Sequence, residues 1–115
     1  MSYKGTIADW SFDIINCNKA IIGDIYKCFG YTDGKTISTS PIRSVSIESV
    51  RAKDDKFVVV TTANDSKYIL LRPDTIFTNF INNCFEDDED KSKGKEFTFE
   101  TLDGTKNIIE WYLTK

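Results

Sequence analysis

The sequence contains no histidine, only three arginines among its fifteen basic residues, and only two prolines. Histidine is the side chain that most often transfers protons near neutral pH, and its imidazole is the commonest nitrogen ligand of metals. Its absence argues against most hydrolase mechanisms and most zinc sites. The spacing of the remaining acids selects no carboxylate pair for acid and base catalysis. We therefore expect a protein that is not an enzyme and that uses no metal ion or cofactor.

Basic residues are not in excess either. Fifteen lysines and arginines face eighteen aspartates and glutamates, which gives a formal net charge of −3 at pH 7. Proteins that bind long nucleic acids owe much of their affinity to a field of positive charge. The sequence therefore predicts no long nucleic-acid partner.

Long apolar runs are missing as well. No segment approaches the roughly 18 apolar residues of a membrane span, and the first residues carry no apolar stretch of signal-peptide length. The three cysteines are an odd number, lack a C-x-x-C pair and stand among apolar neighbours: Cys17, Cys28 and Cys84. We expect a cytoplasmic protein without a membrane partner, in which these cysteines are reduced and half-buried.

The chain has 115 residues, 40% of them hydrophobic, which suits one domain over residues 1–115. Two-residue alternation predicts strands over about 10–14, 21–26 and 42–48. Two hairpins are expected, the first over 57–62 and 67–71. The second covers 96–102 and 105–113 around Asp103-Gly104, the strongest short-range turn signal in the chain. Three consecutive valines in 57–62 predict a strand covered on both faces.

One helix is expected near residues 74–85. Pro73 and Asp74 form a suitable start, because proline fits the first turn and an acid favours the positive end of the helix. Apolar residues then recur at helical spacing and form a wide stripe: Ile76, Phe77, Phe80, Ile81, Cys84 and Phe85. This stripe should pack on the sheet or on a second subunit. The predicted fold is α+β, a mainly antiparallel sheet or small barrel of about seven strands with one amphipathic helix.

Five acidic residues follow this helix without interruption: Glu86, Asp87, Asp88, Glu89 and Asp90. A calcium loop of the EF-hand type spaces its acids at alternating positions around a central glycine, so a metal site is not expected here. A solvated connection is the simpler interpretation. The alternative is a surface that contacts a basic protein partner.

A second group of residues has the chemistry of a site for a small anionic ring ligand. Tyrosine faces stack on rings, hydroxyls bond to ligand oxygens, and arginine recognises phosphate through two parallel hydrogen bonds. The candidate ligand-binding residues are Tyr31, Thr39, Ser40, Arg43, Tyr68 and Arg72.

The segment from Phe29 to Ser40 also has a structural interpretation, which needs no ligand. Asp33 and Gly34 favour a chain reversal, and Thr39 and Ser40 can start a strand by bonding to their own backbone. Both interpretations stay open at this point.

The run Phe29-Gly-Tyr-Thr-Asp-Gly34 with Ile37-x-Thr39-Ser40, followed by Thr62 and Ser66-x-Tyr68, resembles small phage-encoded proteins, specifically the first family of Thoeris anti-defence sponges. The resemblance covers residues 20 to 71. It implies a homo-oligomer that sequesters a cyclic nucleotide-derived immune signal without cleaving it, with the ligand between subunits.

The leading hypothesis is thus a non-catalytic cytoplasmic protein that binds a nucleotide-like second messenger. An alternative is an inhibitor or immunity protein whose acidic run, residues 86–90, covers the basic site of a toxin or nuclease. A third is a structural subunit of a phage particle or secretion machine.

Overall fold

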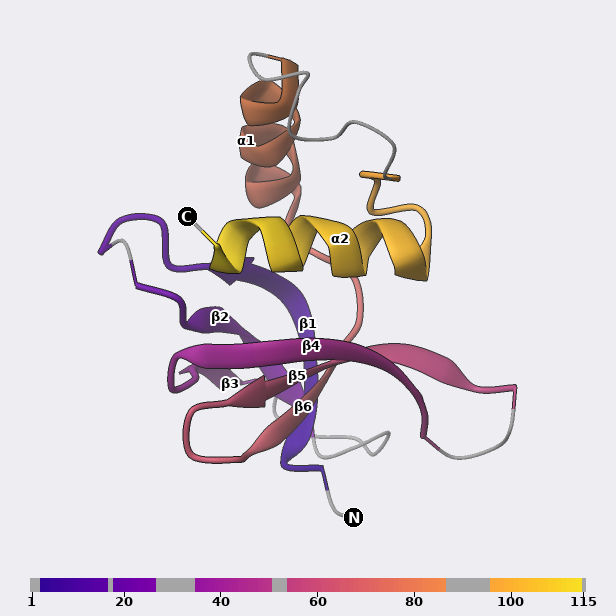
Figure 1. Ribbon diagram of the computed structural model, residues 1–115. Coiled ribbons are helices and arrows are strands. Elements are labelled where there is room, and N and C mark those ends of the chain that lie inside the picture. The colour runs from indigo at the N-terminus through magenta and orange to yellow at the C-terminus, as the bar shows by residue number, and fades with distance from the viewer. Residues whose placement is uncertain (1–2, 17, 27–34, 51–53, 87–95, 115) are drawn as a thin grey trace.

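The computed structural model describes residues 3–16, 18–26, 35–50, 54–86 and 96–114. These ranges contain six strands and two helices (Figure 1). The strands are β1 (Gly5–Phe12), β2 (Ile21–Tyr26), β3 (Lys35–Ser38), β4 (Ile42–Ser49), β5 (Lys56–Thr62) and β6 (Lys67–Leu70). The helices are α1 (Thr75–Glu86) and α2 (Leu102–Leu113).

One sheet contains all six strands, in the order β3-β2-β1-β6-β5-β4. Strands β1 to β3 form one antiparallel meander and β4 to β6 form another. Parallel pairing of β1 with β6 joins the two meanders into a mixed, mostly antiparallel sheet. The predicted α+β class is therefore confirmed, but the sheet is open rather than closed into a barrel.

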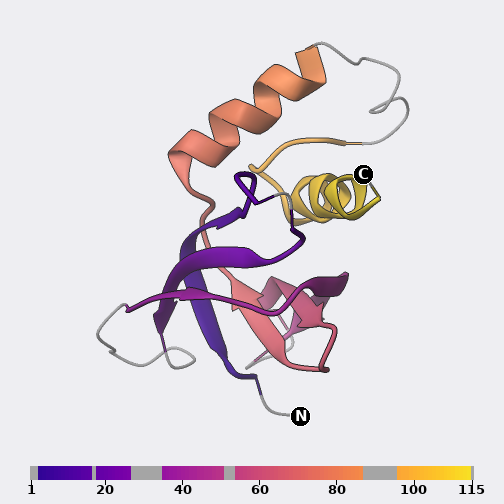
Figure 2. The same ribbon diagram turned by 90° about the vertical axis from the view of Figure 1, so that its left-hand side faces the viewer.

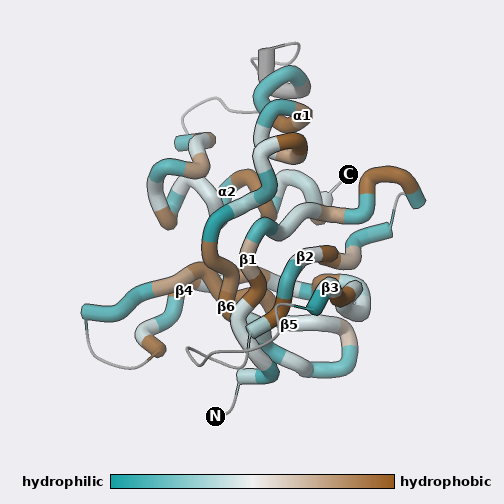
Figure 3. The backbone as a smooth tube through the Cα atoms, turned by 180° about the vertical axis from the view of Figure 1, so that it is seen from behind, coloured by the Kyte–Doolittle hydropathy of each residue, from teal (hydrophilic) through white to brown (hydrophobic). Residues whose placement is uncertain are grey.

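Both helices lie on the same side of the sheet (Figures 1 and 2). The core between these layers is formed by the inward side chains of β1, β2, β4, β5 and β6 together with Phe77 and Ile81 of α1 and Ile108 and Ile109 of α2. Seen from behind, the apolar stretch of β6 lies near the middle of the molecule (Figure 3). In the part of the chain that the structure describes, neither helix is long and apolar enough to span a membrane.

The hairpin predicted over 57–62 and 67–71 is confirmed as β5 and β6. Val58, Val59 and Val60 are all buried, as expected for an interior strand, and β5 indeed lies between β6 and β4. In the turn, Asp65 adopts a positive φ of 66°, a conformation that aspartate tolerates better than most residues.

A bulge in β1 changes which residues share a face. The register with β2 shifts between Ala8 and Ser11, and Asp9 has a φ of 50°. Without the bulge, Ile7 and Trp10 would point to opposite faces of the sheet. With it, Ile7, Trp10 and Phe12 all enter the same core.

The hairpin predicted over 96–102 and 105–113 is wrong, because residues 102–113 form α2 and the sheet has six strands rather than seven. Thr101 caps the helix, and its Oγ1 accepts the Gly104 amide at 3.0 Å. Buried residues then follow helical spacing: Thr105, Ile108, Ile109 and Tyr112. Gly104 allows the segment 98–101 to pack closely against α2, because a Cβ at this position would overlap the Thr98 carbonyl oxygen and lie 2.8 Å from Thr101 Oγ1.

The predicted helix near 74–85 is confirmed as α1. Asp74 starts it, because its Oδ2 accepts the amides of Ile76 and Phe77 at 3.1 and 3.3 Å. The apolar stripe is divided, however: Phe77 and Ile81 are buried, whereas Ile76 and Phe80 are exposed. The side chains of Cys84 and Phe85 lie outside the described residues, as do Cys17 and Cys28.

We predict that Gly104→Ala destabilises the protein. In an unconstrained helix, alanine is favoured over glycine by about 1 kcal/mol, but here the added Cβ meets backbone and forces the 98–101 segment away from α2. Urea unfolding measures the change in the free energy of unfolding. Thr101→Ala, which removes only the cap, should lose about 1 kcal/mol. A Gly104→Ala protein as stable as wild type would contradict this packing.

Candidate functional site

Two hollows lie at the two ends of α2. The larger has a volume of about 440 Å³ and lies between the N-terminal end of α2 and the ends of β5 and β6. We call it the N-terminal cleft. The smaller, the C-terminal hollow, has a volume of about 250 Å³ and lies between β4 and the end of α2.

The N-terminal cleft has mainly apolar walls, which include Phe57, Leu71, Pro73, Phe99 and Leu102. Leu71 and Leu102 are each 39% exposed, which is unusual for large aliphatic side chains in this protein. Leucines left exposed on two sides of one concave surface are typical of a binding site.

Trp10 fixes the wall formed by residues 71–73. Its indole Nε1 donates to the Leu71 carbonyl oxygen at 3.1 Å, and its backbone carbonyl accepts the Asp74 amide at 2.8 Å. A parallel bridge pairs Trp10 with Pro73. The Trp10 ring also contacts the ring of Phe99 at 6.0 Å between centroids, so both walls of the cleft depend on one side chain.

The mouth of the N-terminal cleft carries two cations and one acid: Lys56, Arg72 and Glu100. The Arg72 guanidinium donates two hydrogen bonds to Asp9, at 2.9 and 3.3 Å. This pairing raises the pKa of Arg72. Arg72 has five N–H donors, and its other three have no partner among the residues that the structure describes. Lys56 likewise makes no ion pair within the described ranges.

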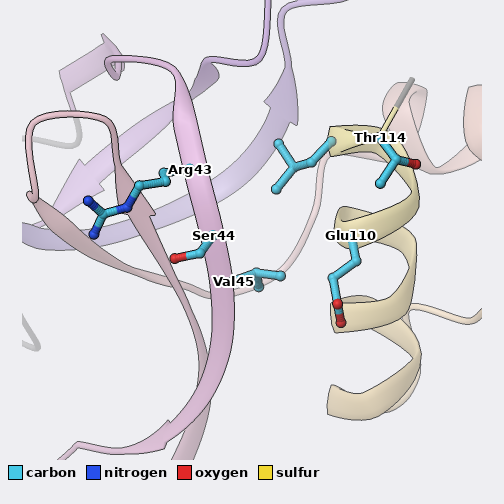
Figure 4. Close-up of a pocket in the computed structure, with 6 residues that line it drawn as sticks. Arg43, Ser44, Val45, Glu110 and Thr114 are labelled. Carbon is cyan, nitrogen blue, oxygen red and sulfur yellow. The ribbon is translucent and has the colours of Figure 1, made fainter.

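The C-terminal hollow is smaller and more polar. Figure 4 shows Val45 pointing from β4 toward α2, whereas the Arg43 side chain points away from the helix. Arg43 instead pairs with Asp65 at 2.6 Å. The C-terminal end of a helix carries partial negative charge. Glu110 adds a carboxylate to the lining of this hollow. Of the two hollows, the N-terminal cleft is therefore better suited to an anionic ligand.

The structure divides the predicted ligand residues into separate groups. Thr39 is buried, and its Oγ1 donates to the Ser40 carbonyl at 2.8 Å and accepts the Ile21 amide at 3.0 Å. Ser40 Oγ accepts a hydrogen bond from Asn64 at 3.4 Å. The Thr39 hydroxyl therefore bonds to backbone groups, as the structural interpretation expects, whereas the Ser40 hydroxyl bonds to a side chain of the β5–β6 turn. Tyr68 is half-buried against the core, and Tyr31 lies outside the described residues.

The two candidate arginines lie at opposite ends of the β5–β6 hairpin. Arg43 is next to the pairing of Ser44 with Thr61, and Arg72 follows the pairing of Leu70 with Val58. At about 3.3 Å per residue, roughly six residues of strand separate these ends by about 20 Å. Within one protomer, one small ligand cannot contact both arginines, and only Arg72 lies at the N-terminal cleft.

Sequence reasoning missed a polar cluster on the sheet face away from the helices. Glu48 accepts hydrogen bonds from Tyr3 Oη at 2.9 Å, Ser46 Oγ at 2.7 Å and Lys67 Nζ at 3.1 Å. Burial acts to raise the pKa of Glu48, but these hydrogen bonds outweigh it and hold the pKa below its ordinary value. The same bond to Glu48 raises the pKa of Tyr3. The alternation of Ser46 and Glu48 signalled a polar face, but no local pattern signalled their distant partners.

No group of three or more metal-ligating side chains occurs within the described ranges. Glu86 is the last residue of α1, and Asp87, Asp88, Glu89 and Asp90 lie outside the described residues. The acidic run as a protein-binding surface thus stays a prediction.

Comparison of the chain with protein-family models, with curated proteins and with solved structures found no match.

We predict that Glu48 makes the stability of the protein depend on acidic pH. Its folded pKa is lowered, so the ionised carboxylate stabilises the fold above about pH 4.3, the ordinary value for glutamate. That stability is lost as the pH falls through the folded pKa. Urea unfolding from neutral to acidic pH should therefore show a steeper loss for wild type than for Glu48→Gln.

Glu110→Gln is the matched control, because Glu110 pairs with Lys106 on the surface of α2. Exposed pairs of this kind contribute about 0 to 1 kcal/mol, so its pH profile should follow wild type. Parallel profiles for wild type and Glu48→Gln would show that the cluster does not stabilise the fold.

Proposed function

We propose that the protein is a non-catalytic binding protein that sequesters a small anionic, ring-containing ligand in the N-terminal cleft. The observation that carries this proposal is the cleft itself: about 440 Å³, with apolar walls and with Lys56 and Arg72 at its mouth. Small-molecule sites usually have volumes of about 300 to 1,000 Å³, mainly apolar walls and a few polar groups that orient the ligand.

The proposed binding mode divides the ligand into two parts. Its flat apolar part lies between Leu71 and Leu102, beside the phenylalanines of the wall. Burial of apolar surface contributes about 25 cal/mol per Å², so the rings supply most of the affinity. Its anionic part lies at the mouth, where Lys56 supplies charge and Arg72 supplies the N–H donors that Asp9 leaves unused.

Binding without turnover is supported by the hydroxyl groups of the cleft. Thr101 Oγ1 accepts the Gly104 amide, and Thr105 Oγ1 donates to the Thr101 carbonyl at 2.8 Å. Both hydroxyls therefore stabilise the start of α2, and among the described residues neither is paired with a base that would activate it as a nucleophile.

The most specific form of the proposal names the ligand as a cyclic nucleotide-derived immune messenger. It is supported by the resemblance of residues 20 to 71 to the first family of Thoeris anti-defence sponges. In this form the protein is phage-encoded, acts in the cytoplasm of a bacterial cell and is a homo-oligomer.

Titration calorimetry against cyclic dinucleotides, cyclic trinucleotides and cyclic ADP-ribose isomers tests the proposal. At least one of these ligands should release or absorb heat. Leu102→Asp should weaken its binding about tenfold or more, because a carboxylate replaces apolar surface that is worth about 1.5 to 3 kcal/mol when buried.

Arg72→Ala and Arg43→Ala form a matched pair, because each arginine is exposed and paired with one aspartate. Arg72→Ala should weaken binding, and Arg43→Ala should leave it unchanged. No heat from any ligand with folded wild-type protein would refute a nucleotide ligand and would favour the alternative, a protein-binding inhibitor. Equal losses in both arginine variants would place the ligand outside the N-terminal cleft.

A further inference from the structure

The outer surface of α1 differs from that of α2, although both helices have twelve residues. On α2, Asp103, Lys106 and Glu110 carry charge. On α1, no residue from Thr75 to Phe85 is charged, in a chain of which 29% is charged. Helices that face water carry charged or polar side chains on their outer face, and α1 has only uncharged ones from Thr75 to Phe85.

Two apolar side chains on α1 remain outside the core. Ile76 is 76% exposed and Phe80 is 37% exposed, whereas Phe77 and Ile81 are buried. Residues four apart lie on the same face of a helix, so Ile76 and Phe80 form one continuous strip, which we call the α1 strip. The exposed amides of Asn79 and Asn83 lie beside it.

The α1 strip is accessible because α1 is held by its start and by the face that carries the buried Phe77 and Ile81. The Asp74 amide donates to the Trp10 carbonyl, and the Phe77 ring contacts the Trp10 and Phe12 rings at 5.7 and 6.0 Å. Beyond its start the helix extends away from the sheet in both views of the fold (Figures 1 and 2).

We propose that the α1 strip binds the α1 strip of a second copy of this chain, as an antiparallel helix pair about a two-fold axis. In a two-fold contact each surface meets its own copy, so charges of one sign near the axis face each other. A strip without charge avoids this repulsion and is its own complement. Asparagine amides both donate and accept hydrogen bonds, so Asn79 and Asn83 can bond to polar groups across the contact. Antiparallel helices also place opposite dipole ends side by side.

The size of α1 sets the expected strength of this contact. Twelve residues span about 18 Å, so the pair falls below the standard interface of about 1,600 Å². We therefore expect a weak dimer, with a dissociation constant between about 10 and 500 µM. This contact specifies the homo-oligomer that the most specific form of the proposed function names, and it rests on that part alone. It does not involve the N-terminal cleft, so dimerisation and ligand binding can fail separately.

Sedimentation equilibrium of the full chain, without ligand, tests the proposal. Wild type should be monomeric at about 1 µM and mainly dimeric at about 1 mM, concentrations chosen to bracket that range. Ile76→Asp should raise the dissociation constant about tenfold or more, because it places a carboxylate against the apolar side chains of the partner strip. Ile76→Asn, which is neutral and loses only apolar surface, should raise it by a smaller factor.

Ile15→Asp is the matched control, because it makes the same change at an isoleucine that is 88% exposed in the loop after β1. Its dissociation constant should equal that of wild type. Far-ultraviolet circular dichroism should confirm that all variants fold, as expected for exposed positions. A wild-type protein that stays monomeric at about 1 mM, or an Ile15→Asp variant that loses the dimer as fully as Ile76→Asp, would overturn the proposal.

Discussion

The contacts of Trp10 determine how the layers of this protein meet. Its indole and backbone groups bond to residues 71, 72 and 74, at the junction between β6 and α1. Its ring contacts Phe12, Phe77 and Phe99, which belong to the sheet, α1 and the segment before α2. The bulge at Asp9 is what turns this side chain toward the helices. One residue thus links the sheet to the start of α1 and to the segment that leads into α2, and it holds both walls of the N-terminal cleft.

Much of this architecture is readable from local sequence patterns. The β5–β6 hairpin and α1 follow from alternation, turn residues and helical spacing, each within a few residues of the structure. The wrong prediction of a hairpin where α2 lies has a specific cause. Asp103-Gly104 is a strong turn signal, but Thr101 caps a helix at the same place, and Gly104 meets the Thr98 carbonyl too closely for a side chain. The spacing of Thr105, Ile108, Ile109 and Tyr112 is helical, but the prediction followed the turn signal alone.

The candidate site was less predictable, because its contacts join residues far apart in sequence. Arg72 could be selected for its chemistry, but its partner Asp9 is 63 residues away. Glu48 meets Tyr3 across 45 residues, and β1 meets β6 only because two meanders join in parallel. Thr39 and Ser40 show the same limit: the Thr39 hydroxyl bonds locally to the Ser40 carbonyl, but it also accepts the Ile21 amide, and the Ser40 hydroxyl accepts from Asn64. What decides the site is topology, which brings Lys56, Leu71 and Leu102 around one cleft.

We propose that the ligand binds at the N-terminal end of α2 rather than at its C-terminal end. Backbone amide shifts, recorded by nuclear magnetic resonance during titration with a cyclic dinucleotide, report on both ends in one experiment. We expect shifts that saturate and that concentrate at Phe57, Leu71 and Leu102, with little change at Ser44, Val45 and Leu113. Saturating shifts centred on Ser44, Val45 and Leu113 instead would contradict this proposal.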